Sequence, residues 1–544
     1  MGTIDLMIIG LFILGLIGIA YWVMKHKKDD TSDYFLSGRS ETWIAVGAAL
    51  FAANIGSEHL VGLAGAGAET GMAMAHWEMQ GWLILLLGWV FVPFYAHSKV
   101  FTMPEFLMKR FNKNSSSFLS IITLISYILT KVSVTAYCGG VFLQAVTGIQ
   151  TMGGIDFFWI AAIGLVLLTG IYTVLGGMKG IMMLSVVQTP ILLAGAVTIL
   201  ILGFLKVGDG TLISGWGEIV KYSGDNMHLI HKPGDELYQQ FPGVAVILGS
   251  AIIGFWYWCT DQTIVQRVLS AKDMNNARKG SIFAGFLKVL PVFLFLIPGM
   301  IAAVLKQKGL VNFDSNDQAY GSLVSALLPV GIKGVVIVGF ICALMTSLAA
   351  HFNSSATLFT IDFYKNWRPQ ASEHKLVLVG RIATVAVVVL GLLWIPIMRN
   401  LGNVLYEYLQ NVQSLIAPAI AAVFLMGVFN KKITPKAGEW GLIVGFCIGM
   451  FRLGCMIFKP ESMQWFLDIN WLYFCIYLFI FTIILMIVIS FFTKAATEEQ
   501  LQGMTYSSQS AEQKAEIKSS WTKLDIFTSL AVIALCAAFY YYFW

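Results

Sequence analysis

Charged residues are scarce in this chain of 544 residues: only 12% are Asp, Glu, Lys or Arg, whereas 57% are hydrophobic. Soluble domains carry about a quarter charged residues, so the composition excludes a soluble enzyme. Familiar catalytic and nucleotide-binding motifs are also missing. The sequence has no P-loop, no HExxH pair and no glycine fingerprint for a nucleotide in a strand context. ATP-driven transport and metalloprotease chemistry therefore have no support.

Cysteine is sparse too, and its placement argues against disulfides and zinc. All seven cysteines lie in apolar stretches and none belongs to a CxxC pair. We expect them to be small packing residues. The net charge of +5 does not indicate nucleic-acid binding, because the basic residues gather in alternate loops between the apolar stretches.

Long apolar blocks are what the chain has in abundance. A block of about 20 apolar residues crosses a bilayer as a helix, because every backbone amide is then satisfied within the helix. The sequence predicts an all-α integral membrane protein with about fourteen spans. The first block has no small-residue cleavage site, so we expect a retained span. The predicted spans cover about residues 5–24, 43–68, 76–98, 118–147, 155–175, 181–205, 243–266, 280–305, 332–360, 375–398, 403–428, 437–458, 468–493 and 523–544.

Lys and Arg crowd into alternate loops between these blocks. By the positive-inside rule such loops are cytoplasmic, which predicts a multi-pass plasma-membrane protein with both termini outside. Only three connections are long, and none is long enough for a separate folded domain. Residues 206–242 and 306–331 are predicted to lie outside and 494–522 inside.

Two predicted spans contain polar, glycine-bearing runs where a plain membrane helix would be apolar. They are residues 52–59 (AANIGSEH) and 254–262 (GFWYWCTDQ), five spans apart. An odd spacing makes the two segments enter the membrane from opposite sides, and paired interrupted helices indicate a transporter site near the midplane. We assign inverted repeats to 43–205 (spans 2–6) and 243–428 (spans 7–11). Residues 1–42 hold the first span and a cytoplasmic loop, and 429–544 hold spans 12–14.

Ionisable side chains within these spans are candidates for a binding site, because each costs a few kcal/mol in hydrocarbon unless it has a partner or a watery cavity. A sugar presents hydroxyls that both donate and accept, and carboxylate, amide, imidazole and ammonium groups can each bind them. Aromatic rings suit the apolar face of a pyranose. For single residues, a snorkelling Lys288 or a satisfied interhelical His59 remains open. The candidates are Asn54, Glu58, His59, Glu78, Tyr257, Trp258, Asp261, Lys288, Glu407 and Gln410.

A second candidate cluster consists of the hydroxyls of Thr346 and Ser347. Sodium takes oxygen ligands, and carbonyls freed where a helix unwinds can join one or two hydroxyls to replace its water shell. Taken alone, hydroxyls bonded to the preceding helical turn are the commoner arrangement.

At these residues the chain resembles the sodium/solute symporter family, and within it the sodium/glucose cotransporters. The resemblance runs through nearly the whole chain and implies fourteen spans, with a LeuT-type core of two inverted five-helix repeats at spans 2–11. The matching stretches are FAANIGSEH at 51–59, VGLAGAGA at 61–68, TMPEFLMKRF at 102–111, WYWCTDQTIVQRVLSAK at 256–272 and FNSSATLFTIDFY at 352–364.

The resemblance also implies two sets of site residues. The sodium site maps to the carbonyls of Ala52, Ile55 and Ala343 and the hydroxyls of Thr346 and Ser347. Tyr257 would cover the sugar on its inner side as a gate. The implied sugar contacts are Asn54, His59, Glu78, Tyr257, Trp258, Lys288 and Gln410.

Two departures from the family pattern bear on the substrate and the ion. Ser185, Ala349 and Ala350 stand where relatives with a second sodium site tend to carry an aspartate and hydroxyls, so we predict one sodium per sugar. Gly254 stands where relatives often place a polar sugar contact. This leaves glucose, galactose and inositol open.

We therefore expect sodium-coupled symport of a monosaccharide, glucose or galactose, by alternating access. We expect no enzyme activity, no cofactor besides the co-transported sodium ion, no nucleic-acid partner, and a lipid bilayer as the surroundings. The alternatives are sodium-coupled transport of myo-inositol or another organic solute, or a sugar-gated sensor or channel. A sialic acid is disfavoured because its carboxylate calls for an arginine and Glu78 would repel it. A membrane enzyme is disfavoured because no activated nucleophile accompanies His59 or His351.

Overall fold

The computed structural model describes residues 2–26, 31–56, 58–98, 100–399 and 405–544. The described residues form helices throughout, apart from one two-stranded antiparallel hairpin that pairs Thr151 with Asp156 and Met152 with Ile155. This confirms the predicted all-α class. The principal helices are α1 (Thr3–His26), α2 (Thr31–Leu36), α3 (Trp43–Asn54), α4 (Ala64–Thr70), α5 (Gly81–Leu86), α6 (Val92–Ser98), α7 (Met103–Arg110), α8 (Lys113–Ser126), α9 (Ser133–Thr147), α10 (Phe157–Val207), α11 (Leu212–Ser223), α12 (Ala245–Phe255), α13 (Gln262–Leu269), α14 (Met274–Leu287), α15 (Ile297–Gln307), α16 (Ala319–Leu327), α17 (Ile332–Leu358), α18 (Glu373–Arg399), α19 (Leu405–Phe429), α20 (Pro435–Phe458), α21 (Gln464–Leu467), α22 (Trp471–Phe492), α23 (Glu498–Leu501), α24 (Ala511–Ser519) and α25 (Lys523–Phe543).

Short segments of 3-10 helix or π-helix join several of these helices. The hairpin strands are β1 (Thr151–Met152) and β2 (Ile155–Asp156). The joining segments are η1 (Ser37–Arg39), η2 (Glu58–Leu63), η3 (Ala73–Trp77), η4 (Leu87–Phe91), η5 (Tyr127–Val132), η6 (Gly224–Met227), η7 (Glu236–Tyr238), η8 (Trp256–Thr260), η9 (Val292–Leu296), η10 (Asn316–Gln318), η11 (Phe359–Lys365), η12 (Glu461–Met463) and η13 (Tyr506–Ser508).

Ten helical stretches of the described chain are long and apolar enough to cross a membrane, and a bent pair makes eleven. Two shorter apolar helices, at Thr3–Gly15 and Ala245–Thr260, fall below that length. The multi-pass architecture is confirmed, and the count of fourteen stays a prediction.

Helix α10 combines two predicted spans in one continuous run. Its 51 residues would measure about 76 Å if straight, more than twice the roughly 30 Å hydrocarbon core. The run breaks at Gly177, whose φ of 55° and ψ of −156° are not helical. A side chain there would meet the Tyr34 carbonyl oxygen at 2.8 Å, so glycine permits both the turn and the close packing. The break falls between the predicted spans 155–175 and 181–205.

Both spans that were predicted to be interrupted are broken in the structure. Helices α3, which ends at Asn54, and η2–α4, which begins at Glu58, are bent by 56° relative to each other. In the second broken span, η8 ends at Thr260, and Asp261 has an extended backbone (ψ 132°) before α13 begins. Each break leaves backbone polar groups without helical partners at a buried position.

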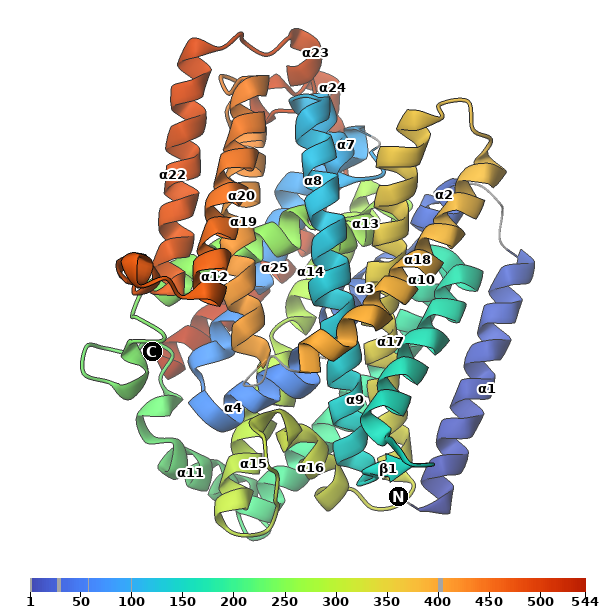
Figure 1. Ribbon diagram of the computed structural model, residues 1–544, viewed down its shortest axis with the longest axis vertical. Helices are drawn as coiled ribbons and strands as arrows, with labels where there is room; N and C mark the ends of the chain where they lie inside the picture. Colours follow the sequence, from blue (N-terminus) through green and yellow to red (C-terminus); the bar gives the residue numbers. More distant parts are fainter. Residues whose placement is uncertain (1, 27–30, 57, 99, 400–404) are drawn as a thin grey trace.

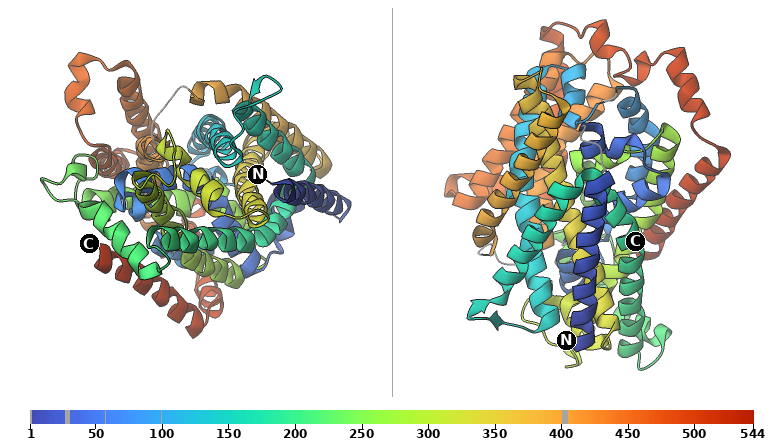
Figure 2. Two further views of the ribbon diagram at one scale, coloured as in Figure 1. Left: turned by 90° about the horizontal axis from the view of Figure 1, so that it is seen from below. Right: turned by 90° about the vertical axis from the view of Figure 1, so that its right-hand side faces the viewer.

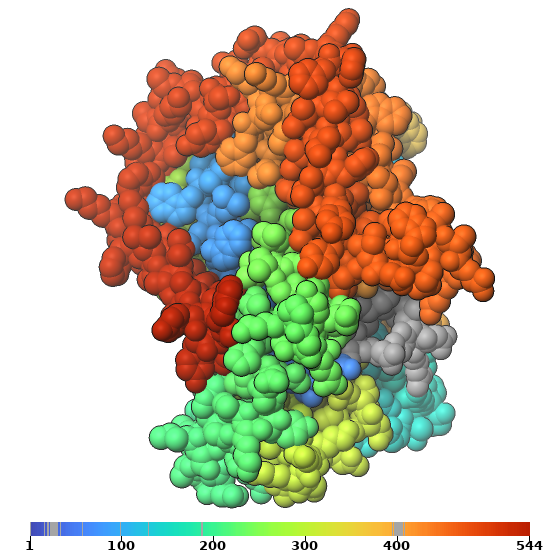
Figure 3. Space-filling model, turned by 90° about the vertical axis from the view of Figure 1, so that its left-hand side faces the viewer, coloured from blue at the N-terminus to red at the C-terminus, as the bar shows by residue number. Residues whose placement is uncertain are grey.

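The helices run roughly parallel to the long axis of the molecule, so that its loops gather at two ends (Figure 1). Helices α2, α7, α23 and α24 lie at the upper end, while α11, α15, α16 and the β hairpin lie at the lower end. Helix α1 packs on the periphery, as both views in Figure 2 show. On another face, the red C-terminal segment and the orange α19–α22 region flank an exposed blue segment (Figure 3).

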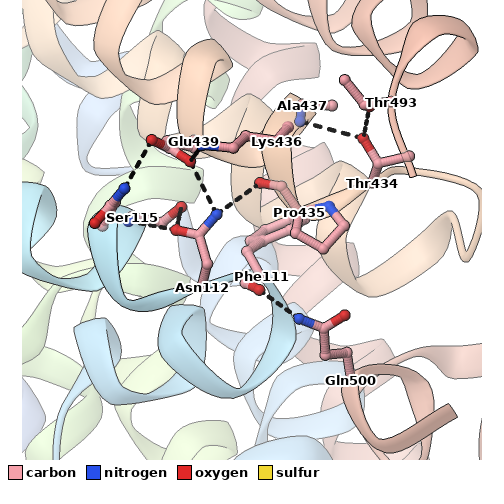
Figure 4. A network of polar contacts seen from close by, with 11 residues as sticks. Phe111, Asn112, Ser115, Thr434, Pro435, Lys436, Ala437, Glu439, Thr493 and Gln500 are labelled. Atoms are coloured by element: carbon pink, nitrogen blue, oxygen red, sulfur yellow. Dashed lines mark hydrogen bonds and ion pairs between the residues drawn. The ribbon is translucent and has the colours of Figure 1, made fainter. Parts of the chain in front are cut away.

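A polar network ties the upper-end loops together (Figure 4). The Asn112 amide, at the start of α8, donates to Glu439 Oε2 of α20 at 3.0 Å, and Lys436 Nζ contacts the same oxygen at 2.9 Å. Gln500 of α23 donates through Nε2 to the Phe111 carbonyl at 2.6 Å. The loop 494–522 is therefore docked against the end of α7.

Both ends of the chain contact loops that were predicted to lie outside. Asp5 Oδ1 accepts the N–H of Gly331, at the end of the connection 306–331, at 2.7 Å. His228, in the connection 206–242, contacts the Trp544 carbonyl through Nδ1 at 2.8 Å. The N-terminus lies at the lower end of Figure 1, whereas the C-terminus lies about midway along the long axis.

Candidate functional site

A small cavity of about 30 Å³ lies where the broken helix α3–η2 faces η8, α14 and α19. All seven predicted sugar contacts line it, although they come from segments more than 350 residues apart in sequence. Its lining consists of Asn54, Glu58, His59, Trp77, Glu78, Gln80, Lys131, Ile253, Gly254, Tyr257, Trp258, Lys288, Tyr406, Gln410 and Gln413.

Glu78 is the hub of the cavity wall and is fully buried. Its Oε2 contacts Lys288 Nζ at 2.5 Å and His59 Nε2 at 3.2 Å. Its Oε1 accepts a hydrogen bond from the Tyr406 hydroxyl at 3.0 Å. Three donors on three elements therefore hold one carboxylate, which is how a charge is kept in an apolar interior.

Lys288 connects this hub to the broken helix. Its ammonium donates to Asn54 Oδ1 at 3.0 Å, and it lies 5.6 Å from the centre of the Trp258 ring. The Asn54 amide nitrogen in turn donates to the Tyr257 hydroxyl at 3.5 Å. Lys288 is 3% exposed, so it does not snorkel to the surface.

A second ion pair lies in the same wall. Lys131 Nζ contacts Glu58 Oε1 at 2.7 Å and lies 5.4 Å from the centre of the Tyr257 ring. Sequence reasoning missed Lys131, although a lysine inside the predicted span 118–147 was a signal of the same kind as Lys288. It also missed Trp77, Gln80, Tyr406 and Gln413, whose residue types do not stand out in apolar spans.

Three buried polar atoms of the wall have no hydrogen-bond partner within the described chain: His59 Nδ1, Trp77 Nε1 and Gln410 Oε1. Because the His59 Nε2 faces a carboxylate, we assign its proton to Nε2, which makes Nδ1 an acceptor. The wall thus offers two acceptors and one donor. Buried polar groups are normally satisfied, so these atoms suit the hydroxyls of a bound solute.

All five predicted sodium residues are buried, and of these Ala52 and Ile55 lie at the end of α3, where the first broken helix unwinds. Ile55 leaves the helix with ψ 99°, and among the described backbone hydrogen bonds none joins the Gly56 N–H to the Ala52 carbonyl. A side-chain carbon at Gly56 would lie 2.7 Å from Ser347 Oγ. The Ser347 hydroxyl therefore faces the unwound turn.

Thr346 and Ala343 lie on the same helix α17, which packs against α3. The Thr346 hydroxyl donates to the Cys342 carbonyl at 2.8 Å, which is the back-bonded arrangement that the sequence left open. Its lone pairs remain acceptors for a cation. No cluster of three or more His, Cys, Asp or Glu side chains able to hold a metal occurs among the described residues, so carbonyls and hydroxyls are the oxygen ligands that this break can offer.

Asp261, a sequence candidate, and Ser185, where a second sodium site would need an aspartate, both make their contacts outside the cavity wall. Asp261 caps α13, because its Oδ1 accepts the Thr263 N–H at 2.9 Å and the Tyr127 hydroxyl at 2.8 Å. Ser185 donates to the Ile181 carbonyl at 2.8 Å within α10. The side chain of Glu407 lies outside the described residues.

Comparison with known proteins places this chain in a family. The sodium:solute symporter family matches residues 34–445. The chain is 36% identical to sodium/myo-inositol cotransporter 2 of Mus musculus over 536 residues, which are 92% of this chain and 79% of that protein. It is 34% identical to sodium/glucose cotransporter 4 of Mus musculus over 545 residues, covering 93% and 78%. It is 35% identical to sodium/glucose cotransporter 1 of Ovis aries over 547 residues, covering 92% and 81%.

A solved structure gives the fold independently. A Na+-coupled sialic acid symporter, in a substrate-bound outward-open state, aligns with a TM-score of 0.75 at 19% identity over 91% of this chain and 99% of that one. The fold is the predicted LeuT type. With the family match covering most of its length, this chain belongs to the sodium:solute symporter family, and sodium is the ion it co-transports.

Proposed function

We propose that the protein carries a neutral, hydroxyl-rich solute together with sodium across the plasma membrane, with a monosaccharide such as glucose or galactose as the preferred cargo. The observation that carries this proposal is the buried cavity whose wall combines paired charges, aromatic rings and unpartnered hydrogen-bonding atoms. The solute crosses chemically unchanged.

Charge balance supports a neutral solute. The cavity wall holds two carboxylates, Glu78 and Glu58, and each is paired with a lysine, Lys288 and Lys131 respectively. A carboxylate-bearing solute would meet no uncommitted cation and would lie beside one buried anion, Glu78, and one partly exposed anion, Glu58, which is costly in a medium of low dielectric constant. Hexoses and myo-inositol both satisfy this requirement, and relatives named for each kind of cargo are similar to this chain.

The broken helix supplies the coupling. Asn54 and His59 flank the turn at which Ile55 and Gly56 leave the helix, and Ser347 faces that turn. Sodium bound there by carbonyls and hydroxyls would fix the turn and with it the two solute-binding side chains. Linkage then requires that sodium raises solute affinity by the same factor by which solute raises sodium affinity.

One sodium per solute sets a thermodynamic ceiling. One charge moving through 100 mV supplies about 2.3 kcal/mol, and a tenfold sodium gradient supplies about 1.4 kcal/mol. Together these limit accumulation to roughly 500-fold. The single stoichiometry rests on Ser185, Ala349 and Ala350, which stand where a second site would need an aspartate and hydroxyls.

For orientation, we propose that the upper end of Figure 1 is cytoplasmic and that both termini lie outside. The basic loops share the upper end, and the contacts of Asp5 and Trp544 join both ends of the chain to the two long connections that are predicted to lie outside. We place the inverted repeats at 43–205 and 243–428, with each broken helix near the start of its repeat.

The test is uptake into proteoliposomes from a panel of labelled glucose, galactose, myo-inositol and a sialic acid, with sodium outside or replaced by choline. We expect sodium-dependent accumulation of a neutral member, recovered intact by mass spectrometry. The Glu78→Gln variant should take up none, whereas Lys206→Gln, at an exposed lysine of α10, should match the native protein. Equal uptake in choline would contradict coupling. Sugar-evoked current without uptake would identify a sensor or channel instead.

A further inference from the structure

A groove on the outside of the helix bundle lies away from the solute cavity. It runs between α8–η5, η11 and α18, has a volume of about 450 Å³, and its lining is almost wholly apolar. Ile125 and Ile128 form one side, Phe359 and Tyr364 the floor, and Ile382 and Leu390 the other side. Ile125 and Ile382 are 52% and 60% exposed, so the groove opens toward the surroundings of the bundle, which at these spans are lipid.

The length of the groove matches one leaflet. Its lining on α18 extends from Val379 to Leu390, about 17 Å along a helix axis at 1.5 Å per residue. Half of a hydrocarbon core is about 15 Å. Because α18 starts at Glu373, next to the upper-end loop, this stretch covers the half of the membrane nearer that end.

The upper end of the groove is aromatic and carries three basic residues and one carboxylate, Glu373, which accepts the Thr31 N–H at 3.0 Å. Tyr364 lines the groove, and its neighbour Lys365 ends η11. Trp367 is 72% exposed and lies 6.4 Å from the Tyr364 ring, and the Arg368 guanidinium lies 5.0 Å from the Trp367 ring. Lys375 follows in the first turn of α18. Tyrosine and tryptophan favour the headgroup level, and clustered Lys and Arg attract anionic headgroups.

We propose that this groove binds an anionic glycerophospholipid of the cytoplasmic leaflet. One acyl chain lies between α8 and α18, and the phosphate group contacts Lys365, Arg368 and Lys375. The charge of these three residues selects an anionic over a zwitterionic headgroup. Helix α17 continues directly into η11, so the lipid contacts the extension of the helix that carries Ser347. The inference does not depend on which solute is transported.

The test measures lipid retention by the purified full-length protein in detergent, without sodium or sugar. Phosphatidylglycerol and phosphatidylcholine with the same acyl chains are added, and retained lipid is counted by native mass spectrometry and by the shift in melting temperature. One basic residue near an anionic surface contributes about fivefold, so the native protein should prefer phosphatidylglycerol by up to about a hundredfold.

Two variants separate headgroup from chain. The triple variant Lys365→Gln, Arg368→Gln, Lys375→Gln should lose the preference and keep phosphatidylcholine binding. Its matched control removes three exposed lysines of the cytoplasmic loop instead: Lys494→Gln, Lys514→Gln and Lys518→Gln. Ala386→Trp, which fills the groove, should lose both lipids, whereas Ala534→Trp on the exposed face of α25 should lose neither.

Three results would overturn the proposal. They are equal retention of the two lipids by the native protein, an undiminished preference in the triple variant, and unchanged retention in Ala386→Trp. The triple variant changes residues at a helix end and in a loop, so it keeps the test decisive if the tryptophan variant does not fold.

Discussion

Removing the Lys288 ammonium should reveal how much of the stability of the fold depends on the cavity wall. In Lys288→Met the Glu78 carboxylate loses its contact at 2.5 Å and stays fully buried. Breaking a buried ion pair on one side costs about 3–5 kcal/mol. We expect the lower end of that range, about 3 kcal/mol, because Tyr406 and His59 still contact the carboxylate.

The expected thermal shift follows from the size of the chain. The entropy of unfolding is about 2.1 cal/mol/K per residue, so a loss of about 3 kcal/mol lowers the melting temperature by about 3 °C if all 544 residues unfold together. The shift grows if a smaller cooperative unit unfolds. Differential scanning fluorimetry in detergent measures it, with Lys206→Met as a control that removes an exposed lysine from α10.

The double variant Glu78→Gln, Lys288→Met tests whether the lost stability comes from the unpaired charge of Glu78. It removes both charges and leaves an amide that can still accept the Tyr406 hydroxyl, so most of the lost stability should return. Sodium-driven uptake should be absent from the single and the double variant, because both lack solute contacts. If the double variant melts no higher than Lys288→Met, the stability of this wall does not come from charge pairing, and the argument for a neutral solute loses its basis.

Four further predictions concern the ion and the second ion pair. Ser347→Ala should raise the sodium concentration for half-maximal uptake about tenfold, which is the effect of one lost hydrogen bond to a charge. Ser355→Ala, further along the same helix α17, should leave that concentration unchanged. Gly56→Ala should have a larger effect, since its methyl group would lie 2.7 Å from Ser347 Oγ; native sodium dependence would contradict the proposed position of the ion. Reversal potentials in proteoliposomes should give one sodium per solute, and a ratio of two would contradict it. Glu58→Gln should lower the melting temperature by leaving Lys131 unpaired, and Lys131→Met added to it should restore stability; an unaltered melting temperature in Glu58→Gln would mean that the pair at 2.7 Å contributes nothing.

The sequence was informative where chemistry is unusual for its surroundings. Charges and amides in apolar blocks are expensive, so Glu78, Lys288 and Gln410 could be identified without coordinates, and the structure brings them to one cavity. Tyr406 could not be identified in this way, because a tyrosine in an apolar helix signals no particular face. The three-dimensional path of the chain alone shows that its hydroxyl reaches Glu78.

The number of spans was harder to predict than the site. Apolar length alone does not show where one helix ends and the next begins, and α10 joins two predicted spans at the sharp, non-helical turn of Gly177. The partners of individual charges could not be predicted either. Asp261 is a carboxylate in an apolar span, which is typical of a binding residue, but in the structure it caps α13. Local polarity predicts that a group needs a partner, whereas only the packing of distant helices decides which one.

In the cavity wall, Glu78 is paired with Lys288 and Glu58 with Lys131 before any solute binds, and this pairing affects how fast a solute is released. A solute that enters must exchange its bonds to water for bonds to groups such as Lys288 and Glu78, which are already engaged with each other. The net gain per exchanged hydrogen bond is then about 1 kcal/mol, so selectivity comes from the pattern of hydroxyls and the residence time stays short. A carrier must release its solute on the far side of the membrane. Because the charges of the cavity wall are paired with each other, the solute can leave without exposing an unpaired buried charge.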